Sequence, residues 1–185
     1  FWCDLKHVLA HGTDTAVNHA AGISPMSKTD LPILEQRRIE ANIIKPIYEE
    51  MKAEIGEQTA RRIIAAAVTR NAIEQGAAYA KTEGSDTSLE SFHALLPQWK
   101  ANGALEVDML EETESKVSYN VIRCQYAEMY KEMGLADIGH LLSCGRDGTF
   151  CKGYDPRISL TRTQTIMQGA SYCDFRYSIS DDKSG

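Results

Sequence analysis

The chain has 185 residues, a length that fits one domain with a hydrophobic core of its own. Its composition is 43% hydrophobic and 25% charged, which is typical of a globular protein and argues against a disordered one. With a formal net charge of −6 and a pI near 5.4, the chain has no electrostatic reason to bind nucleic acid or a membrane surface, and we expect neither partner.

The apolar stretches and the cysteines indicate in which cellular compartment the protein is expected. The longest apolar stretch covers residues 63–68, whereas a transmembrane helix needs about 20 residues. The five cysteines are an odd number in a chain that is not small, so they do not predict a disulfide scaffold. We therefore expect a cytoplasmic protein with reduced thiols.

The N-terminal part of the chain predicts helices after a mixed extension, residues 1–30. Asp30 and Pro32 form a typical helix start, with an aspartate N-cap and a proline in the first turn. Apolar residues then recur at helical spacing over residues 31–55. Pro46 lies inside this pattern and predicts a kink or a split.

Two more helices complete the helical half, residues 31–100. The second is predicted over residues 58–81, and its many alanines would let another helix pack closely. That neighbour could belong to a second copy of the chain, so a homo-oligomer is one expectation. The third helix is predicted over residues 89–100, with Ser85 or Asp86 as its cap.

Residues 104–180 change to the two-residue period of β-strands. Predicted strands cover residues 104–110, 116–123, 158–165 and 172–180, and short helices cover residues 125–133 and 136–142. The first two strands and the last two form hairpins. The chain therefore predicts a single α+β domain over residues 1–185, with N-terminal helices packed on a roughly four-stranded antiparallel sheet.

The last part of the chain carries most of the groups that could do chemistry. Residues 144–156 and 160–169 contain glycines between cysteines, arginines and aspartates, and they predict two loops that lead into strands. Reactive groups on loops and strand ends of a rigid sheet are a common arrangement for a functional site.

This region resembles the C-terminal signature of the L-2-amino-thiazoline-4-carboxylic acid hydrolase family. The matching segments are Arg146-Asp147, Gly153-Tyr154-Asp155-Pro156, Arg162-Thr163-Gln164-Thr165, and Gly169 leading to Cys173-Asp174-Phe175. The ending is also similar to small-molecule-binding domains of the vinyl reductase type, which resemble TRAPP subunits in layout.

The family resemblance implies a hydrolase that opens a small heterocyclic ring by adding water. The ring would be a cyclic amidine, a lactam or a thiazoline carboxylate, cleaved at a C–N bond or at the ring C–S bond. This chemistry needs a nucleophile, proton transfer to the leaving group and a cation for the substrate's carboxylate. Cys173 is the candidate nucleophile, with simple packing in the core as its alternative and Cys124 as a second candidate thiol.

Asp174 or His140 would transfer protons, and Arg162 would hold the substrate's carboxylate through its guanidinium. Further candidates for substrate binding are Arg146, Asp147, Arg176 and Tyr154. Each assignment has a structural alternative. Asp174 and Arg176 alternate with Cys173 along the strand and could form a salt-bridged outer face. Arg162 could belong to a cross-strand ion pair, the Arg146-Asp147 pair could stabilise a turn, and His140 could be a surface residue.

Two sets of residues are possible metal ligands. Asp4, His7 and His11 could share a helical face, and Cys144 and Cys151 are separated by six residues, which is not a standard zinc spacing. We expect no metal. The chain also has no dinucleotide fingerprint and no phosphate-binding glycine loop, so we expect no cofactor. The expected partner is a small molecule that carries a carboxylate. The alternatives are a binding module without catalysis and an assembly partner.

Overall fold

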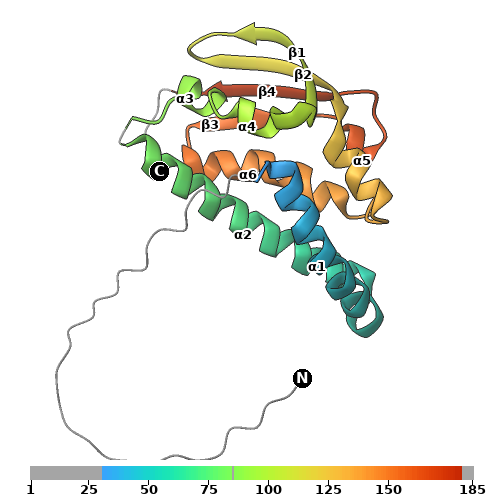
Figure 1. Ribbon diagram of the computed structural model, residues 1–185. Coiled ribbons are helices and arrows are strands. Elements are labelled where there is room, and N and C mark those ends of the chain that lie inside the picture. The colour runs from blue at the N-terminus through green and yellow to red at the C-terminus, as the bar shows by residue number, and fades with distance from the viewer. Residues whose placement is uncertain (1–30, 85, 181–185) are drawn as a thin grey trace, which may run out of the picture. The chain divides into compact units, whose positions relative to one another are not determined.

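Residues 31–84 and 86–180, which the computed structural model describes, form a four-stranded antiparallel sheet with helices against one of its faces (Figure 1). The long helices come first in the chain, and the strands lie in the C-terminal half. This is the α+β arrangement that the sequence predicted. No helix among the described residues is long and apolar enough to cross a membrane.

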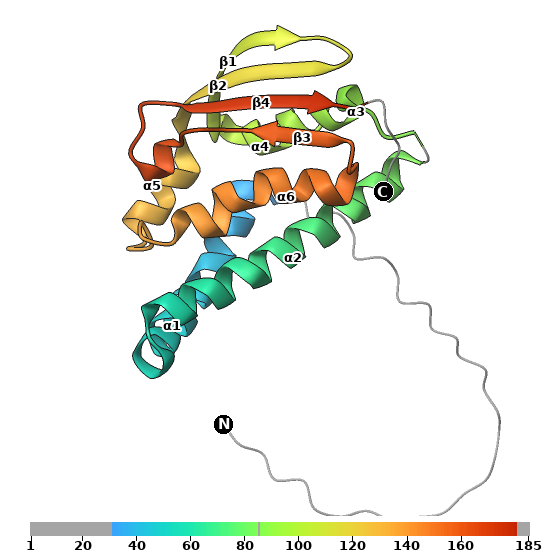
Figure 2. The ribbon, with the colours of Figure 1, turned by 180° about the vertical axis from the view of Figure 1, so that it is seen from behind.

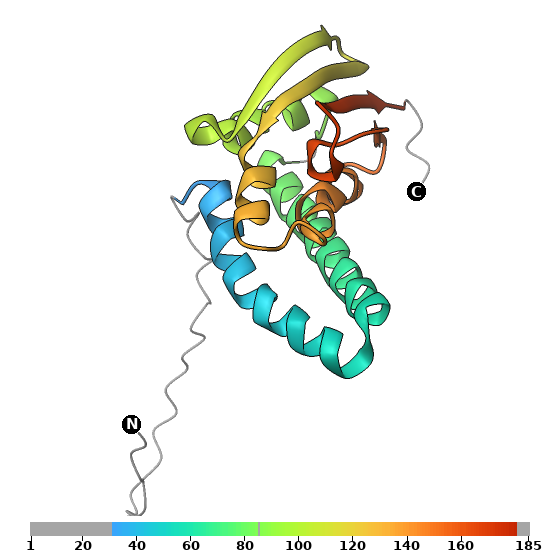
Figure 3. The same cartoon turned by 90° about the vertical axis from the view of Figure 1, so that its right-hand side faces the viewer.

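Helix α1 covers Ile33–Ile55 and helix α2 covers Glu57–Glu83, and Figure 3 shows them as an antiparallel pair below the sheet. α1 begins after Pro32, while the predicted cap Asp30 lies outside the described residues. The helix is not split at Pro46. Asn42 and Pro46 are both exposed, so solvent can satisfy the carbonyl group that proline leaves without a donor.

The alanine-rich helix α2 packs against helix α6 (Gly145–Tyr154) of the same chain. The two helices lie side by side in Figures 1 and 2. Their contact is backbone to backbone. A Cβ atom at Gly153 would lie 1.9 Å from the Ile73 carbonyl oxygen, and one at Gly76 would lie 2.2 Å from the Phe150 carbonyl oxygen. The neighbour that the small side chains of α2 admit is therefore α6.

The prediction of a loop over residues 144–156 was wrong. A π-helical segment, His140–Cys144, continues directly into α6, so the predicted short helix over residues 136–142 was also misplaced. Glycine punctuation suggested turns, but no glycine of α6 has a positive φ. At Gly153 the missing side chain serves the contact with α2 and not a turn.

The predicted third helix is interrupted and forms α3 and α4, over Leu89–His93 and Leu96–Lys100. Pro97 lies in the first turn of α4, where proline favours a new helix start. The cap of α3 is Ser88, which forms a capping box with Ser91. Asp86, one of the two predicted caps, is therefore not the N-cap residue of α3. The other, Ser85, lies outside the described residues.

The strands are β1 (Leu105–Glu112), β2 (Lys116–Cys124), β3 (Ile158–Thr161) and β4 (Cys173–Ile179), and helix α5 (Gln125–Glu132) follows β2. Both predicted hairpins are present, and β2 pairs with β4 to give the order β1-β2-β4-β3. β3 is shorter than predicted because the backbone N–H groups of Thr163 and Gln164 donate to the Asp174 carboxylate and not to a strand.

Two clusters of buried side chains fill the space between the layers. One joins α3, α4 and α6 to β2 and β4, and the other joins α1, α2 and α5. On α1, Arg37 and Ala41 are buried, whereas Ile39, Ile43 and Ile47 are exposed. The isoleucines that gave α1 its helical pattern therefore do not all belong to the core.

Candidate functional site

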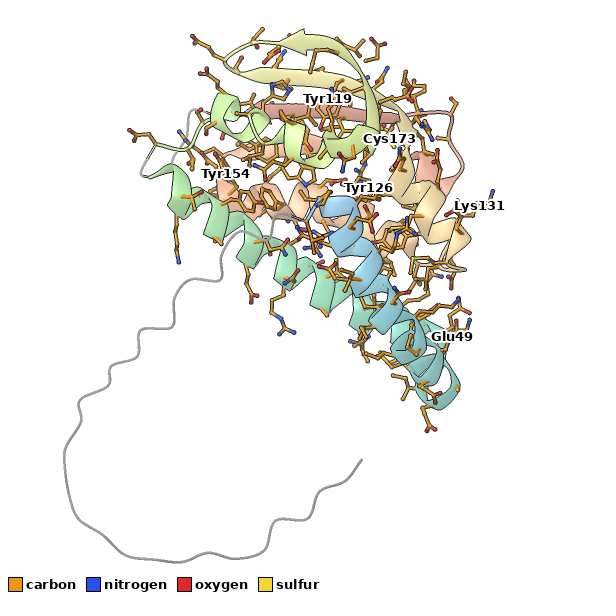
Figure 4. All side chains as sticks on the ribbon, in the orientation of Figure 1. Glu49, Tyr119, Tyr126, Lys131, Tyr154 and Cys173 are labelled. Atoms are coloured by element: carbon orange, nitrogen blue, oxygen red, sulfur yellow. The ribbon has the colours of Figure 1, made fainter. Side chains whose placement is uncertain are left out.

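A cavity of about 230 Å³ lies between the sheet and the helices. Its lining comes from α1, α2, α5 and α6, from α3 and α4, from the start of β1, and from the inward faces of β2 and β4. Tyr119, Cys173 and Tyr126 belong to this lining, and Figure 4 shows them in the space between the sheet and the helices. Most lining side chains are aromatic or aliphatic, with a few charged groups among them, which is the composition of small-molecule sites.

Helix α6 brings Arg146 to the cavity, and this side chain is only 9% exposed. Its Nη2 donates to Asn71 Oδ1 at 2.8 Å and to Gln75 Oε1 at 2.5 Å. Within the described part of the chain Arg146 has no carboxylate at ion-pair distance. Burial and the neighbouring Arg37 charge lower the pKa of Arg146 to about 10, so it stays cationic at neutral pH.

A second guanidinium, Arg37 of α1, lines the cavity beside Arg146. Its Nη1 donates to both carboxylate oxygens of Glu40 at 2.7 Å, and its Nη2 reaches Gln75 Oε1 at 3.5 Å. One amide oxygen thus accepts from both arginines. We did not single out Arg37 from the sequence, although its position four residues before Ala41 on the inward face of a predicted helix was a usable signal.

Arg162, the predicted carboxylate clamp, already has a carboxylate partner. Its Nη1 donates to the Asp147 side chain, and its Nη2 donates to the Cys144 carbonyl oxygen at 2.8 Å. The guanidinium also lies 4.9 Å from the centre of the Phe175 ring. Burial raises the pKa of Asp147, and Arg162 opposes that rise. Arg162 and Asp147 both line the cavity, as an ion pair on its wall.

Cys173 lies on the cavity wall and is 4% exposed. Its Sγ accepts a hydrogen bond from the Ile166 backbone N–H at 3.1 Å. Burial raises the pKa of its thiol, while the Ile166 N–H and the Arg162 charge oppose the rise. As predicted from strand alternation, Cys173 shares the inward face of β4 with Phe175 and Tyr177.

Cys124 and Cys144 also line the cavity, and Cys151 is buried outside its lining. All three are free thiols. Burial raises the pKa of Cys124 to about 11 and those of Cys144 and Cys151 to about 12. At neutral pH these three groups are protonated thiols and poor nucleophiles.

His93, the last residue of α3, is a cavity residue that sequence reasoning missed. Its Nδ1 lies 2.9 Å from Glu112 Oε1 on β1. Its Nε2 is buried and has no hydrogen-bond partner among the described residues. No sequence signal pointed to this pair, because the two residues lie on different elements and the register that joins them depends on the β1–β2 hairpin.

Four predicted site residues do not line the cavity. Asp174 lies on the other face of β4 and accepts hydrogen bonds from Thr163 and Gln164. Arg176 lies on that face too, where it donates to the Tyr119 and Phe175 carbonyl oxygens. Two more are Tyr154, whose hydroxyl donates to Ser91 Oγ at 2.8 Å, and His140, which begins the π-helical segment.

The sequence offered two sets of possible metal ligands, although no metal was expected. Asp4, His7 and His11 lie outside the described residues. Across residues 31–84 and 86–180 no group of three or more histidine, cysteine, aspartate or glutamate side chains could hold a metal ion.

Comparison with known proteins gives a family and several similar solved structures. The model of the L-2-amino-thiazoline-4-carboxylic acid hydrolase family matches residues 36–177, well over half of the chain. No curated protein matches the chain.

Two solved structures are similar in fold. One is the phenol-responsive sensory domain of the transcription activator PoxR with phenol, with a TM-score of 0.48 and 13% identity, covering 77% of this chain and 74% of that one. The other is a trafficking protein particle complex subunit 3 from Naegleria fowleri covalently bound to palmitic acid, with a TM-score of 0.48 and 7% identity, covering 80% of this chain and 96% of that one.

Proposed function

Because the chain belongs to the L-2-amino-thiazoline-4-carboxylic acid hydrolase family, we propose that it opens a small heterocyclic ring that carries a carboxylate. The ring is a thiazoline carboxylate, a cyclic amidine or a lactam, and water is added across a C–N bond or the ring C–S bond. The observation that carries this proposal is the buried guanidinium of Arg146, which faces a cavity without a carboxylate partner among the described residues.

Arg146 binds the carboxylate of the substrate in this proposal, in place of Arg162. A buried cation without a counter-ion is unfavourable, and an incoming carboxylate neutralises it through charge-assisted hydrogen bonds. Arg37 supports the same role, because its guanidinium shares Gln75 Oε1 with Arg146. Arg162 is less suited, because Asp147 already neutralises it.

Cys173 acts as the nucleophile. Its Sγ attacks the amidine or carbonyl carbon of the ring, and its proton passes to Asp147, the acidic residue among those described that line the cavity. When the ring bond breaks, its electron pair stays on the leaving ring atom, which takes the proton from Asp147. Water then hydrolyses the bond between sulfur and carbon. Asp147 takes this role in place of Asp174 and His140, which do not line the cavity.

The test is ring opening followed by mass spectrometry, with L-2-amino-thiazoline-4-carboxylate, cyclic amidines, lactams and hydantoin-like rings, with and without a chelator. The variants are Cys173→Ala and Cys173→Ser, and Cys151→Ser is the matched control because that buried thiol does not line the cavity. We expect the wild type and Cys151→Ser to add water to one of these rings, and both Cys173 variants to be folded and inactive. If Cys173→Ala keeps the wild-type rate of ring opening, the nucleophile is water and not Cys173.

A second candidate function is a small-molecule-binding module without catalysis. The specific observation in its favour is that burial raises the pKa of every cysteine in the described cavity lining, Cys124, Cys144 and Cys173. Protonated thiols suit an apolar binding wall as well as a reactive site. If one ring of the panel binds and none is opened, this function is the better account.

A further inference from the structure

The cavity has a polar end and an aromatic end. Helix α2 contributes Gln75 and Tyr79 to its lining, and α6 contributes Arg146 and Phe150. In both helices the polar residue comes four positions before the aromatic one, which is about 6 Å along a helix. The Arg146 Nη2 donates to Gln75 Oε1 at 2.5 Å, and the ring centres of Tyr79 and Phe150 lie 5.6 Å apart. The two helices therefore change from polar to aromatic in the same direction.

The sheet follows the same order. Cys173, Phe175 and Tyr177 face the cavity from β4, and each is separated from the next by roughly 7 Å along the strand. The Tyr177 ring centre lies 5.1 Å from that of Phe92, and Phe92 lies 6.2 Å from Phe150 of α6. Tyr177 thus belongs to the aromatic end, and Cys173 lies towards the polar end.

Two further rings enlarge the aromatic end. The Trp99 ring centre lies 5.6 Å from that of Phe150, and the Tyr119 ring stacks on Phe175 with centres 5.0 Å apart. All four aspartate, glutamate, lysine or arginine residues of the described cavity lining are bonded at the polar end: Arg37, Arg146, Asp147 and Arg162. A wall of rings without such charges favours an apolar or aromatic group of a ligand.

The cavity has room for such a group. Its volume is about 230 Å³, and a dry apolar cavity of about 150 Å³ is enough to bind benzene. One aromatic ring therefore fits, whereas a second fused ring would need the space of the carboxylate-bearing part. The polar end lies closer to solvent, because Asn71, which accepts a hydrogen bond from Arg146, is exposed. The apolar group of a ligand thus lies deeper than its carboxylate.

We propose that the substrate carries, besides its carboxylate, an apolar substituent about the size of one aromatic ring. This inference rests on the proposed function and names its substrate class. The substituent lies against Phe92, Phe150 and Tyr177, while the carboxylate lies at Arg146. The substituent contributes affinity through burial and takes no part in the reaction.

The first experiment measures calorimetric binding of three unreactive carboxylates, acetate, phenylacetate and 2-naphthylacetate, to the full chain. Burial of one phenyl group is expected to make phenylacetate bind about 10- to 100-fold more tightly than acetate. The second fused ring of naphthylacetate should add no affinity. Equal binding of acetate and phenylacetate, or tighter binding of naphthylacetate than of phenylacetate, overturns the proposal.

Variants locate the substituent. Val117 faces the cavity and pairs with Tyr177 across the sheet, so Val117→Phe should fill the aromatic end and remove the advantage of phenylacetate over acetate. Ile122→Phe is the matched control, because Ile122 lies on the same strand and is 53% exposed. Phe92→Leu removes one ring without adding volume, and it should weaken phenylacetate but not acetate. Circular dichroism checks that each variant is folded. If folded Val117→Phe and Phe92→Leu both keep the full advantage of phenylacetate, the substituent does not lie there.

Turnover separates this inference from the proposed function. The compounds are L-2-amino-thiazoline-4-carboxylate and its derivative with a phenyl group on ring carbon 5. We expect the phenyl derivative to be opened with the higher kcat/KM. If phenylacetate binds as expected but neither ring is opened, the proposed hydrolase activity on these rings fails and the aromatic site stands. If the unsubstituted ring is opened and the phenyl group improves neither kcat/KM nor binding, the hydrolase stands and this inference fails.

Discussion

Replacing Gly153 by alanine should force α2 and α6 apart. The new Cβ would lie 1.9 Å from the Ile73 carbonyl oxygen and 3.0 Å from the Ala77 nitrogen. Both are backbone atoms of α2, so no side-chain rotation can relieve the overlap. Overpacking of a core costs up to about 3 kcal/mol, and the better helix propensity of alanine returns about 1 kcal/mol. We therefore expect a net loss of about 2 kcal/mol in the free energy of unfolding.

Urea denaturation measures this loss. In thermal unfolding of a chain of this size, a loss of about 2 kcal/mol lowers Tm by roughly 4–8 °C. Gly148→Ala is the matched control in the same helix. Its Cβ would meet nothing closer than Leu160 Cβ at 3.9 Å, so helix propensity alone acts and stability should rise by about 0.5–1 kcal/mol. If both variants shifted stability in the same direction and by the same amount, the close approach of α2 and α6 would not be the cause.

Three further predictions concern charges and thiols. Arg146→Gln should weaken calorimetric binding of a carboxylate ligand at least tenfold, since a hydrogen bond to a charged group is worth about 1.5–3 kcal/mol, but it should leave the affinity for the amide of that ligand nearly unchanged. Equal losses for acid and amide would remove Arg146 as the anion site. Burial raises the pKa of Asp155, but hydrogen bonds from Arg157 and Thr87 outweigh it, so the net pKa is lowered. A lowered pKa contributes stability above the unfolded value of about 3.9, so Asp155→Asn should destabilise the protein at neutral pH and progressively less as pH falls below that value. A pH-independent difference in urea denaturation would contradict this. With a pKa of about 12 for Cys144, its thiolate fraction at about pH 8 is about 10⁻⁴. Peptide mapping should therefore show its alkylation accelerated at least about 10³-fold by unfolding, and rapid labelling of Cys144 in the native state would refute the high pKa.

Patterns along one element predicted much of the fold. Alternation fixed the faces of β4, and Cys173, Phe175 and Tyr177 are buried together as their spacing indicates. The period of the apolar residues predicted α1 and α2, and the change to a two-residue period predicted both hairpins. These features depend on neighbours in the sequence, so one chain is enough to read them.

Contacts between distant elements could not be read in this way. Gly153 fits α6 only because Ile73 of α2 passes close to it, and the same glycine seen alone suggests a turn. Arg162 forms an ion pair with Asp147, and Asp174 accepts a hydrogen bond from the loop after β3. Whether Arg162 binds substrate or Asp174 transfers protons depends on these partners, which sequence spacing does not reveal. His93 contacts Glu112 on another element, and no pattern along either element predicts that contact. The family resemblance pointed to the correct region, but the cavity also requires α1, α3 and α4.

The contact between α2 and α6 also determines how a molecule can reach the cavity. Both helices contribute to the cavity wall, and their backbones already touch at Gly76 and Gly153. The close α2–α6 contact opposes separation of these two helices, so we expect any motion that admits a ligand to involve other parts of the cavity wall, such as α1 or the α3–α4 segment. Amide hydrogen exchange would then show its slowest rates along the α2–α6 contact. The elements that admit the ligand would exchange faster and slow down when the cavity is filled.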